Sequence, residues 1–256
     1  MSILQRFSLE GRKAVVTGAS SGIGKAIAAG LADAGADVVA AGRNGEALDA
    51  SVKEIESLGR RGLAATVDVA DEESVNAFRD KVKDSFGAIH ILVNSAGVTV
   101  RKPILEMSLK EWDTVLRTNL TGCFLVSKAF GPMLIEQGWG RVINISSIRM
   151  HVTSPGLTAY ASSKGGIVPF TKTLALEWVK YGVTANVIAP GYVDTPLVEY
   201  VKDLPEVYKD TLRPIPMGRW GRPDEVAQVA VFLASEASAY MTGQVVVVDG
   251  GRLAWS

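Results

Sequence analysis

The chain has 256 residues, of which 47% are hydrophobic and 21% charged, proportions typical of one large globular domain. Its 27 basic residues balance 27 acidic ones, so the composition argues for neither a nucleic-acid partner nor an anionic membrane surface. No apolar run approaches the ~18 residues that cross a bilayer, and the first seven residues lack a signal-peptide pattern, so we expect a cytoplasmic protein.

Short β-branched runs alternate with helical segments along the chain. Strands are predicted at residues 14–17, 37–41, 63–67, 89–94, 140–145, 184–189 and 244–248. Continuous apolar strands separated by helices indicate a parallel sheet covered on both faces. The sequence therefore predicts an α/β Rossmann fold, a doubly wound seven-stranded parallel sheet. Since no linker, repeat or charged block interrupts the pattern, we expect a single domain over residues 1–256.

A glycine-rich turn follows the first strand. It reads Gly18-Ala-Ser20-Ser21-Gly22-Ile23-Gly24 and precedes the helical run at residues 25–34. Glycines let the backbone approach a phosphate, and the free N–H groups and dipole of the helix face its charge. The spacing differs from the common G-x-G-x-x-G pattern, and a purely structural turn is the alternative. The order of strand, turn and helix favours dinucleotide binding.

The same turn also fits G-x-S-x-G, the nucleophile elbow of α/β-hydrolases. That fold needs an acid and then a histidine later in the chain, but His90 and His151 both lie among the early and middle strands. Hydrolysis also leaves Gly24 unexplained, so hydrolase function is a remote alternative.

The end of the second strand bears on the choice of nicotinamide cofactor. NAD enzymes usually have a carboxylate there, about 20 residues after the glycine turn, that binds the adenosine ribose. Here the chain reads Gly42-Arg43-Asn44. A guanidinium pairs well with a phosphate, so Arg43 predicts binding of the 2′-phosphate of NADP(H), with Arg43 in solvent as the alternative. The glycine turn has Ser21 and no second basic residue, so use of NAD(H) stays open.

Tyr160 and Lys164 lie one helical turn apart, and Ser147 precedes the tyrosine by thirteen residues. The phenol and the ammonium then project from the same helix face. A cation beside a phenol lowers its pKa toward working pH, as a proton donor or acceptor requires. A serine hydroxyl from a separate segment can hold a carbonyl oxygen beside that phenol.

Cys123 is the only cysteine, which excludes an intrachain disulfide. With two histidines in the chain, no Cys/His zinc cluster is possible, and no metal site is expected. Cys123 lies in an apolar helical stretch and is interpreted as a buried small hydrophobe.

In combination these motifs resemble the short-chain dehydrogenase/reductase family. The resemblance rests on Thr17-Gly-Ala-Ser-Ser-Gly-Ile-Gly24, Asn94-Ser-Ala-Gly97, Asn119, Ser147, Tyr160-x-x-x-Lys164 and Pro190-Gly191, and it runs from about residue 10 to Gly251. Ser95 stands where the family usually has a second asparagine. Several local segments, such as Gly218-Arg-Trp-Gly221, are similar to gluconate 5-dehydrogenases, while 3-oxoacyl carrier-protein reductases and broad ketoreductases share the scaffold.

The resemblance implies an NAD(P)-dependent oxidoreductase acting on CH–OH groups. It implies that Tyr160 exchanges a proton with the substrate oxygen and that Ser147 orients it. Lys164 would then hold the nicotinamide ribose, and Asn119 would support a proton-relaying water, with a helix cap or kink as the alternative for Asn119. Further cofactor contacts are implied for Asn44, Asp68, Val69, Asn94, Ala96, Gly97, Pro190, Gly191, Val193 and Thr195. Asp68 could also be an ordinary acid at a strand end. A cofactor-binding but inactive protein is disfavoured because Tyr160 and Lys164 are both present.

Three segments are expected to line the substrate pocket. They offer Thr99, Arg101, Arg149, His151, Tyr192 and Trp220. Two arginines and a histidine suit a keto-acid or keto-sugar better than a steroid or a long acyl chain. The alternative is that Arg101 and Arg149 point to solvent.

A long proline-rich stretch at residues 192–216 is predicted to be a loop, and the resemblance implies that it closes over the substrate. Two long segments, residues 111–136 and 158–181, carry broad apolar faces and predict a homo-oligomer. In relatives these helices form a dimer interface, and the last strand forms a second one that makes a tetramer.

Overall fold

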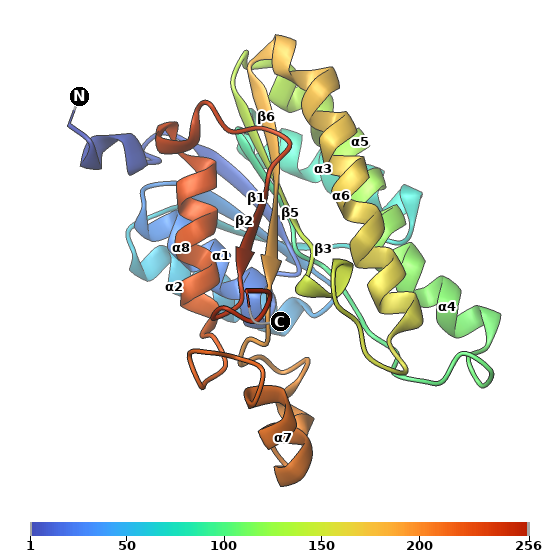
Figure 1. The fold of residues 1–256 in the computed structure, drawn as a ribbon. Helices are drawn as coiled ribbons and strands as arrows, with labels where there is room; N and C mark the ends of the chain where they lie inside the picture. The colour runs from blue at the N-terminus through green and yellow to red at the C-terminus, as the bar shows by residue number, and fades with distance from the viewer. Residues whose placement is uncertain (1, 255–256) are drawn as a thin grey trace.

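The seven predicted strands form one parallel sheet. A computed structural model describes residues 2–254 (Figure 1). The strands run in the order β3-β2-β1-β4-β5-β6-β7. They are β1 Lys13–Thr17, β2 Asp37–Gly42, β3 Gly62–Thr66, β4 Ile91–Asn94, β5 Gly140–Ile145, β6 Val183–Pro190 and β7 Val245–Val248. The strand order reverses between the paired strands β1 and β4. The chain segments that leave their carboxyl ends therefore turn to opposite faces of the sheet and leave room for a ligand between them.

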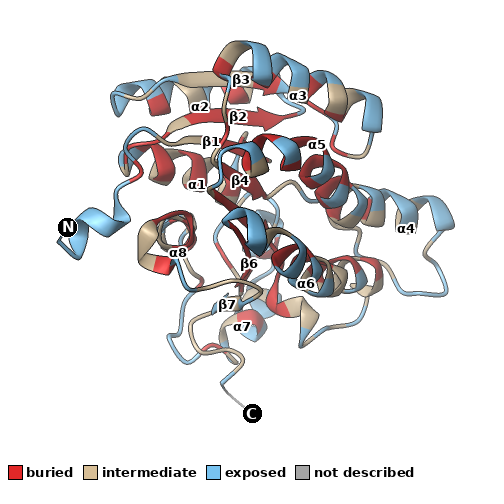
Figure 2. Cartoon of the chain, turned by 90° about the horizontal axis from the view of Figure 1, so that it is seen from above, coloured by how far each residue is buried: buried red, intermediate tan, exposed pale blue. Residues whose placement is uncertain are grey.

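Helices cover both faces of the sheet (Figure 2). One face carries α1 Gly22–Asp33, α2 Gly45–Ser57 and α8 Pro223–Ala234. The other carries α3 Glu72–Phe86, α5 Gly122–Glu136 and α6 Thr158–Trp178. The predicted doubly wound fold is confirmed.

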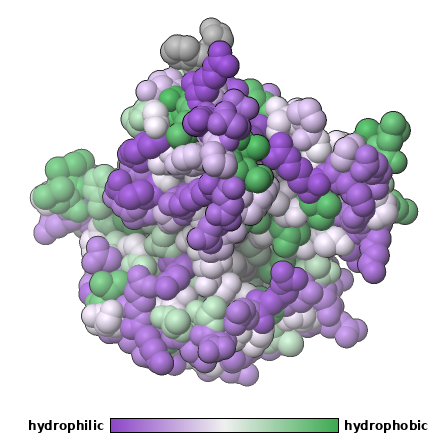
Figure 3. Space-filling model, turned by 90° about the horizontal axis from the view of Figure 1, so that it is seen from below, coloured by the Kyte–Doolittle hydropathy of each residue, from purple (hydrophilic) through white to green (hydrophobic). Residues whose placement is uncertain are grey.

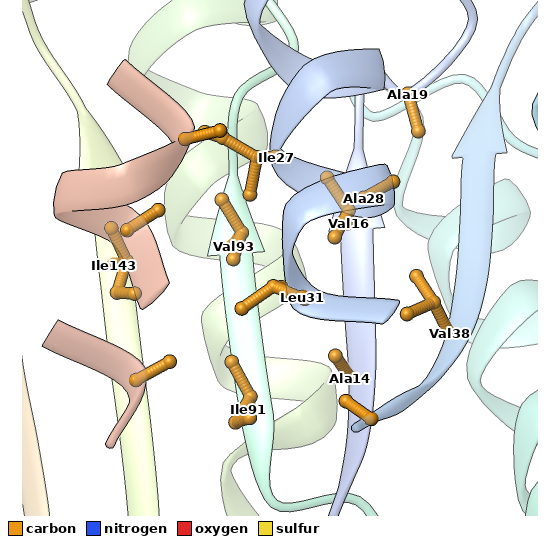
Figure 4. Close-up of a cluster of buried hydrophobic side chains, with 14 of the residues drawn as sticks. Ala14, Val16, Ala19, Ile27, Ala28, Leu31, Val38, Ile91, Val93 and Ile143 are labelled. Carbon is orange, nitrogen blue, oxygen red and sulfur yellow. The ribbon is translucent and has the colours of Figure 1, made fainter. Parts of the chain in front are cut away.

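Alternate residues of each strand enter one of two hydrophobic cores. On β1, Val16 packs with Ile27 and Leu31 of α1, whereas Val15 points to the opposite core (Figure 4). Burying each of these side chains contributes on the order of 1.5–3 kcal/mol. Both strand faces are therefore apolar, which explains the continuous hydrophobic runs in the sequence.

The predicted helical segment at residues 111–136 is interrupted. Helix α4, Leu109–Leu116, begins at a capping box of Ser108 and Glu111. The turn Arg117–Thr121 is π-helical, and α5 continues from Gly122. Such single π turns often mark functional sites, and this one contains Asn119.

The stretch at residues 192–216 was predicted to be a loop, and this is wrong in part. It contains a short 3-10 turn, Glu199–Val201, and helix α7, Pro205–Leu212. Pro205 stands at the start of α7, where its missing N–H costs no helical hydrogen bond. Helix α7 lies beyond the carboxyl ends of β6 and β7, at the bottom of the view in Figure 1.

Within residues 2–254, no helix combines the length and apolar character that a membrane span requires. The same residues contain no cluster of His, Cys, Asp or Glu side chains able to hold a metal ion.

Candidate active site

One large cavity lies at the carboxyl end of the sheet, and its volume is about 530 Å³. Figure 3 views this end of the molecule and shows it hollowed near the centre. Most residues proposed from the sequence line the cavity. They are Gly18, Ser20, Ser21, Gly22, Ile23, Gly24, Arg43, Asp68, Val69, Ala96, Gly97, Thr99, Arg101, Ser147, Arg149, Tyr160, Lys164, Pro190, Gly191, Tyr192, Val193 and Thr195.

The glycine turn brings backbone segments together where side chains would not fit. A Cβ on Gly18 would lie 2.8 Å from Ala96 N, and Gly18 has φ +71°. A Cβ on Gly24 would lie 2.7 Å from Gly18 C, and one on Gly22 would lie 3.2 Å from the Thr195 side chain. The three glycines therefore allow a tight strand-to-helix turn whose backbone lines the cavity.

Helix α1 starts at this turn. Ser21 is its N-cap residue, and its side chain makes no capping hydrogen bond. The first N–H groups of a helix lack partners within it, so they and the dipole present positive charge to the cavity. The cradle fits a pyrophosphate group.

Arg43 lines the cavity beside this turn and is exposed. In the described part of the chain, Arg43 takes part in none of the ion pairs. A free guanidinium beside an anion cradle fits the 2′-phosphate of NADP. Its neighbour Asn44 does not line the cavity, because its Oδ1 accepts a hydrogen bond from Ala47 N at 3.1 Å and caps α2. Binding of cofactor by Asn44 stays a prediction.

Asn94 also points away from the cavity. Its Nδ2 donates to Ser127 Oγ at 3.0 Å and to Asn144 Oδ1 at 2.8 Å. Asn94 therefore ties β4 to β5 and α5, and its direct contact with cofactor stays a prediction. Ser95 stands where the family usually has an asparagine. Its backbone still anchors this segment, because Ser95 N donates to Thr17 Oγ1 at 3.2 Å.

Ser147, Tyr160 and Lys164 meet in the centre of the cavity. Ser147 follows β5 and caps a short 3-10 turn, Ile148–Met150. Tyr160 and Lys164 lie one turn apart on α6, with Lys164 Nζ 5.8 Å from the centre of the phenol ring. The ammonium is buried and donates to Ile145 O at 2.8 Å.

The electrostatics of this group differ from the sequence-based expectation. Burial raises the pKa of Tyr160, while hydrogen bonding to Ser147 and the charge of Arg149 lower it in part. Burial also lowers the pKa of Lys164 to about 8. In this structure Arg149, which was proposed only as a substrate contact, is the cation that opposes the rise at Tyr160. The lowering of the Tyr160 pKa by Lys164 stays a prediction. A protonated phenol at neutral pH is suited to donate a proton to a forming alkoxide.

Asn119 is buried in the π-helical turn but does not line the main cavity. Its Oδ1 accepts from Val98 N at 2.8 Å, and its Nδ2 donates to Val98 O at 2.9 Å and Ser163 Oγ at 3.0 Å. Asn119 thus fixes the segment after Gly97 against α6. Its role in a proton relay stays a prediction.

The substrate end contains two of the predicted cations. Arg149 is half-buried, and its Nη2 donates to Tyr192 Oη at 2.8 Å. Arg101 is exposed at the rim. His151, at the C-terminal cap of the 3-10 turn, is exposed and is not among the residues that line the cavity.

Trp220 does not line the cavity either. It is buried behind Tyr192 with Val201 and Ile215, so its predicted contact with substrate is wrong.

The sequence reasoning missed several residues of the cavity. Val98, Thr118, Leu157, Leu197, Val198 and Tyr200 also line it. Leu197, Val198 and Tyr200 belong to the proline-rich stretch at residues 192–216. Since this stretch was predicted to close over the substrate, its apolar residues could have been proposed as cavity residues. Cys123 is buried, as predicted, and burial raises the pKa of its thiol to about 12.

Comparison with known proteins identifies the relatives of this chain. A family model described as Enoyl-(Acyl carrier protein) reductase matches residues 18–252. The gluconate 5-dehydrogenase of Gluconobacter oxydans is 41% identical over 253 residues, which is 98% of each chain. The 3-oxoacyl-[acyl-carrier-protein] reductase of Thermotoga maritima is 42% identical over 244 residues, which is 95% of this chain and 98% of the relative. A solved gluconate 5-dehydrogenase from Burkholderia cenocepacia, in complex with NADP and tartrate, has a TM-score of 0.95 at 38% identity and covers 99% of both chains.

The fold and the cavity define an oxidoreductase of the Rossmann class, with a dinucleotide cradle in the same cavity as Tyr160. The match over residues 18–252 and the identities of 41% and 42% determine the family. The chain belongs to the short-chain dehydrogenase/reductase family, as the motifs predicted.

Proposed function

We propose that this protein interconverts a secondary alcohol and a carbonyl on a small sugar acid, with NADP(H) as cofactor. One observation carries the proposal: a single cavity has a dinucleotide cradle and Arg43 at one end and Tyr160, Ser147 and Arg149 at the other. The cations at both ends suit a phosphorylated cofactor and an anionic substrate.

The glycine turn, the start of α1 and Arg43 would hold the cofactor. When bound, NADP supplies the hydride acceptor for alcohol oxidation, and NADPH supplies the donor for carbonyl reduction. Ser147 Oγ donates a hydrogen bond to the substrate oxygen and orients it. In reduction Tyr160 donates its phenolic proton to the same oxygen, and in oxidation the phenolate takes that proton back.

Lys164 keeps the proton-transfer site preorganised. Its ammonium is fixed by Ile145 O on the floor of the cavity, 5.8 Å from the Tyr160 ring centre. A positive charge there stabilises a phenolate, so Lys164 supports the oxidative direction when it is protonated. We also propose that Asn119 acts by holding the Gly97–Val98 backbone against α6.

Preference for NADP(H) follows from Arg43 and from the lack of a carboxylate at the end of β2. The Burkholderia relative, whose structure contains NADP, supports this choice. The gluconate 5-dehydrogenase relatives support a substrate with an acid group. So does Arg149, which forms none of the ion pairs among the described residues and donates to the Tyr192 hydroxyl.

A second candidate is the reduction of a 3-oxoacyl thioester, which the Thermotoga relative supports. Purified protein should be assayed with NADPH and 5-ketogluconate, and separately with acetoacetyl thioesters, by the loss of NADPH absorbance. Faster turnover of the sugar acid supports the proposal. Faster turnover of the thioester replaces it with the acyl-reductase function.

We further propose that the whole chain acts as one domain and assembles as a homotetramer. Helices α5 and α6 expose large apolar side chains, including Phe124 at 46% and Leu176 at 78%. Such side chains on adjacent helices favour an interface between copies. Light scattering of the purified protein tests this, and a monomeric mass contradicts it. The cytoplasmic location stays a prediction.

A further inference from the structure

Arg149 is an incompletely paired cation beside the reacting group. It lies two residues after Ser147, and its backbone N donates to Ser147 Oγ at 3.2 Å. Among the described residues, none of the ion pairs includes Arg149, and its guanidinium donates to one side chain, Tyr192. A half-buried guanidinium with unused donors is suited to bind a carboxylate through two parallel hydrogen bonds.

Tyr192 holds this guanidinium in place. Its hydroxyl accepts from Arg149 Nη2 at 2.8 Å, and the Arg149 Cζ atom lies 5.4 Å from the ring centre. Since the hydroxyl acts as acceptor toward Arg149, its own O–H remains able to donate to an acid group bound at the same place.

Trp220 fixes the Tyr192 ring from behind. The two rings stack with centres 5.4 Å apart and an angle of 13° between their planes. The indole Nε1 donates to Thr211 Oγ1 of α7 at 2.8 Å. Tyr208, also on α7, packs edge-on against Trp220 at 4.9 Å. Gly221 N also donates to Tyr192 O at 2.9 Å. Backbone and ring contacts therefore both hold the segment at Tyr192 against the segment at Trp220.

We propose that Trp220 is a positioning residue for substrate specificity, which holds Arg149 through Tyr192 in the orientation that receives the acid group of the substrate. This inference rests on the proposed function and extends it to a residue outside the cavity. The contacts from Trp220 through Tyr192 to Arg149 also link α7 to the site, since the Trp220 indole donates to Thr211 of α7. A guanidinium held in one rotamer loses little entropy when it binds a carboxylate, so loss of the support weakens binding of anionic substrates.

Two variants test the connection. Tyr192→Phe removes one hydroxyl and keeps the stacked ring, whereas Trp220→Phe keeps an apolar ring and removes the hydrogen bond to Thr211. Tyr208→Phe is the matched control, because it keeps the ring that packs on Trp220 and removes a hydroxyl without a partner among the described residues. Thermal unfolding verifies that all three fold.

D-gluconate and D-glucitol form a matched substrate pair, because they differ by a carboxylate in place of a hydroxymethyl group. With saturating NADP, both test variants should raise KM for gluconate roughly fivefold to tenfold. Trp220→Phe, whose side chain lies outside the cavity, should leave kcat little changed and glucitol kinetics unaffected. The control should leave the ratio of the two substrates unchanged. Equal losses for both substrates, or no change in KM for gluconate, overturn the inference.

A double-mutant cycle tests whether Trp220 acts through Arg149. Trp220→Phe should have no further effect on KM for gluconate in an Arg149→Ala background. Additive effects overturn the inference, because they give Trp220 a role independent of Arg149.

Equilibrium binding of tartrate to the enzyme–NADP complex separates this inference from the proposed function. Tartrate, a dicarboxylate, should bind several-fold more weakly to Tyr192→Phe and Trp220→Phe than to the unmodified protein, even if gluconate is not turned over. Absence of gluconate turnover in the unmodified protein refutes the proposed substrate. Unchanged tartrate binding in both variants overturns the inference.

Discussion

Replacing Gly24 with alanine should damage cofactor binding without touching the catalytic residues. The added Cβ would lie 2.7 Å from Gly18 C and 3.2 Å from Ala19 N. Both neighbours are backbone atoms, so the glycine turn must shift to accommodate the methyl group. Overpacking of this kind costs about 1–3 kcal/mol. If the cost falls on the conformation that binds cofactor, the Kd for NADPH rises roughly 5-fold to 150-fold.

Gly165→Ala is the matched control for this change. Gly165 lies inside α6, and a Cβ there meets nothing within 4 Å. The substitution should stabilise the helix by about 0.5–1 kcal/mol and leave NADPH affinity unchanged. Calorimetric titration with NADPH measures the affinities, and urea unfolding measures the stabilities. NADPH affinity in Gly24→Ala equal to that of the unmodified protein refutes the assignment of the glycine turn as the pyrophosphate cradle.

Three further predictions concern the polar residues. Tyr160→Phe should lower kcat at least about a hundredfold and preserve NADPH affinity, because it removes the proton donor alone; more than a few per cent of residual activity contradicts this role. Arg43→Asp should raise KM for NADPH roughly tenfold or more and improve use of NADH, since a carboxylate then faces the 2′-phosphate; equal use of both cofactors by the unmodified protein contradicts it. Burial lowers the pKa of Lys164 from 10.5 to about 8, so between these values the unfolded chain binds more protons and stability rises with pH, by up to about 1.4 kcal/mol per unit. Urea unfolding of Lys164→Met should lack this rise, and an unchanged slope contradicts the argument.

The strands were predictable because burial on both faces leaves a continuous apolar run, such as that of β1. The π-helical turn at Asn119 was not predictable, since five residues do not distinguish its period from that of an α-helix. Helix α7 was missed because the prolines of residues 192–216 were interpreted as signs of a loop, although proline is favoured at the first helical position, where Pro205 stands.

The centre of the site was predictable from spacing, because Tyr160 and Lys164 share one helix face and Ser147 follows the end of β5. Side-chain direction in turns was not predictable. His151 lies two residues after Arg149, yet the 3-10 turn between them leaves one at the cavity and the other exposed. Trp220 was interpreted as a pocket residue, but its aromatic ring stacks behind Tyr192.

The most direct test of the proposed function is a crystal structure of the protein with NADP and gluconate. The proposal predicts a pyrophosphate on the glycine turn, the 2′-phosphate at Arg43, a substrate hydroxyl within hydrogen-bond distance of Tyr160 and Ser147, and the carboxylate at Arg149. Gluconate bound away from Tyr160, or with its carboxylate directed away from Arg149, would contradict the proposed function.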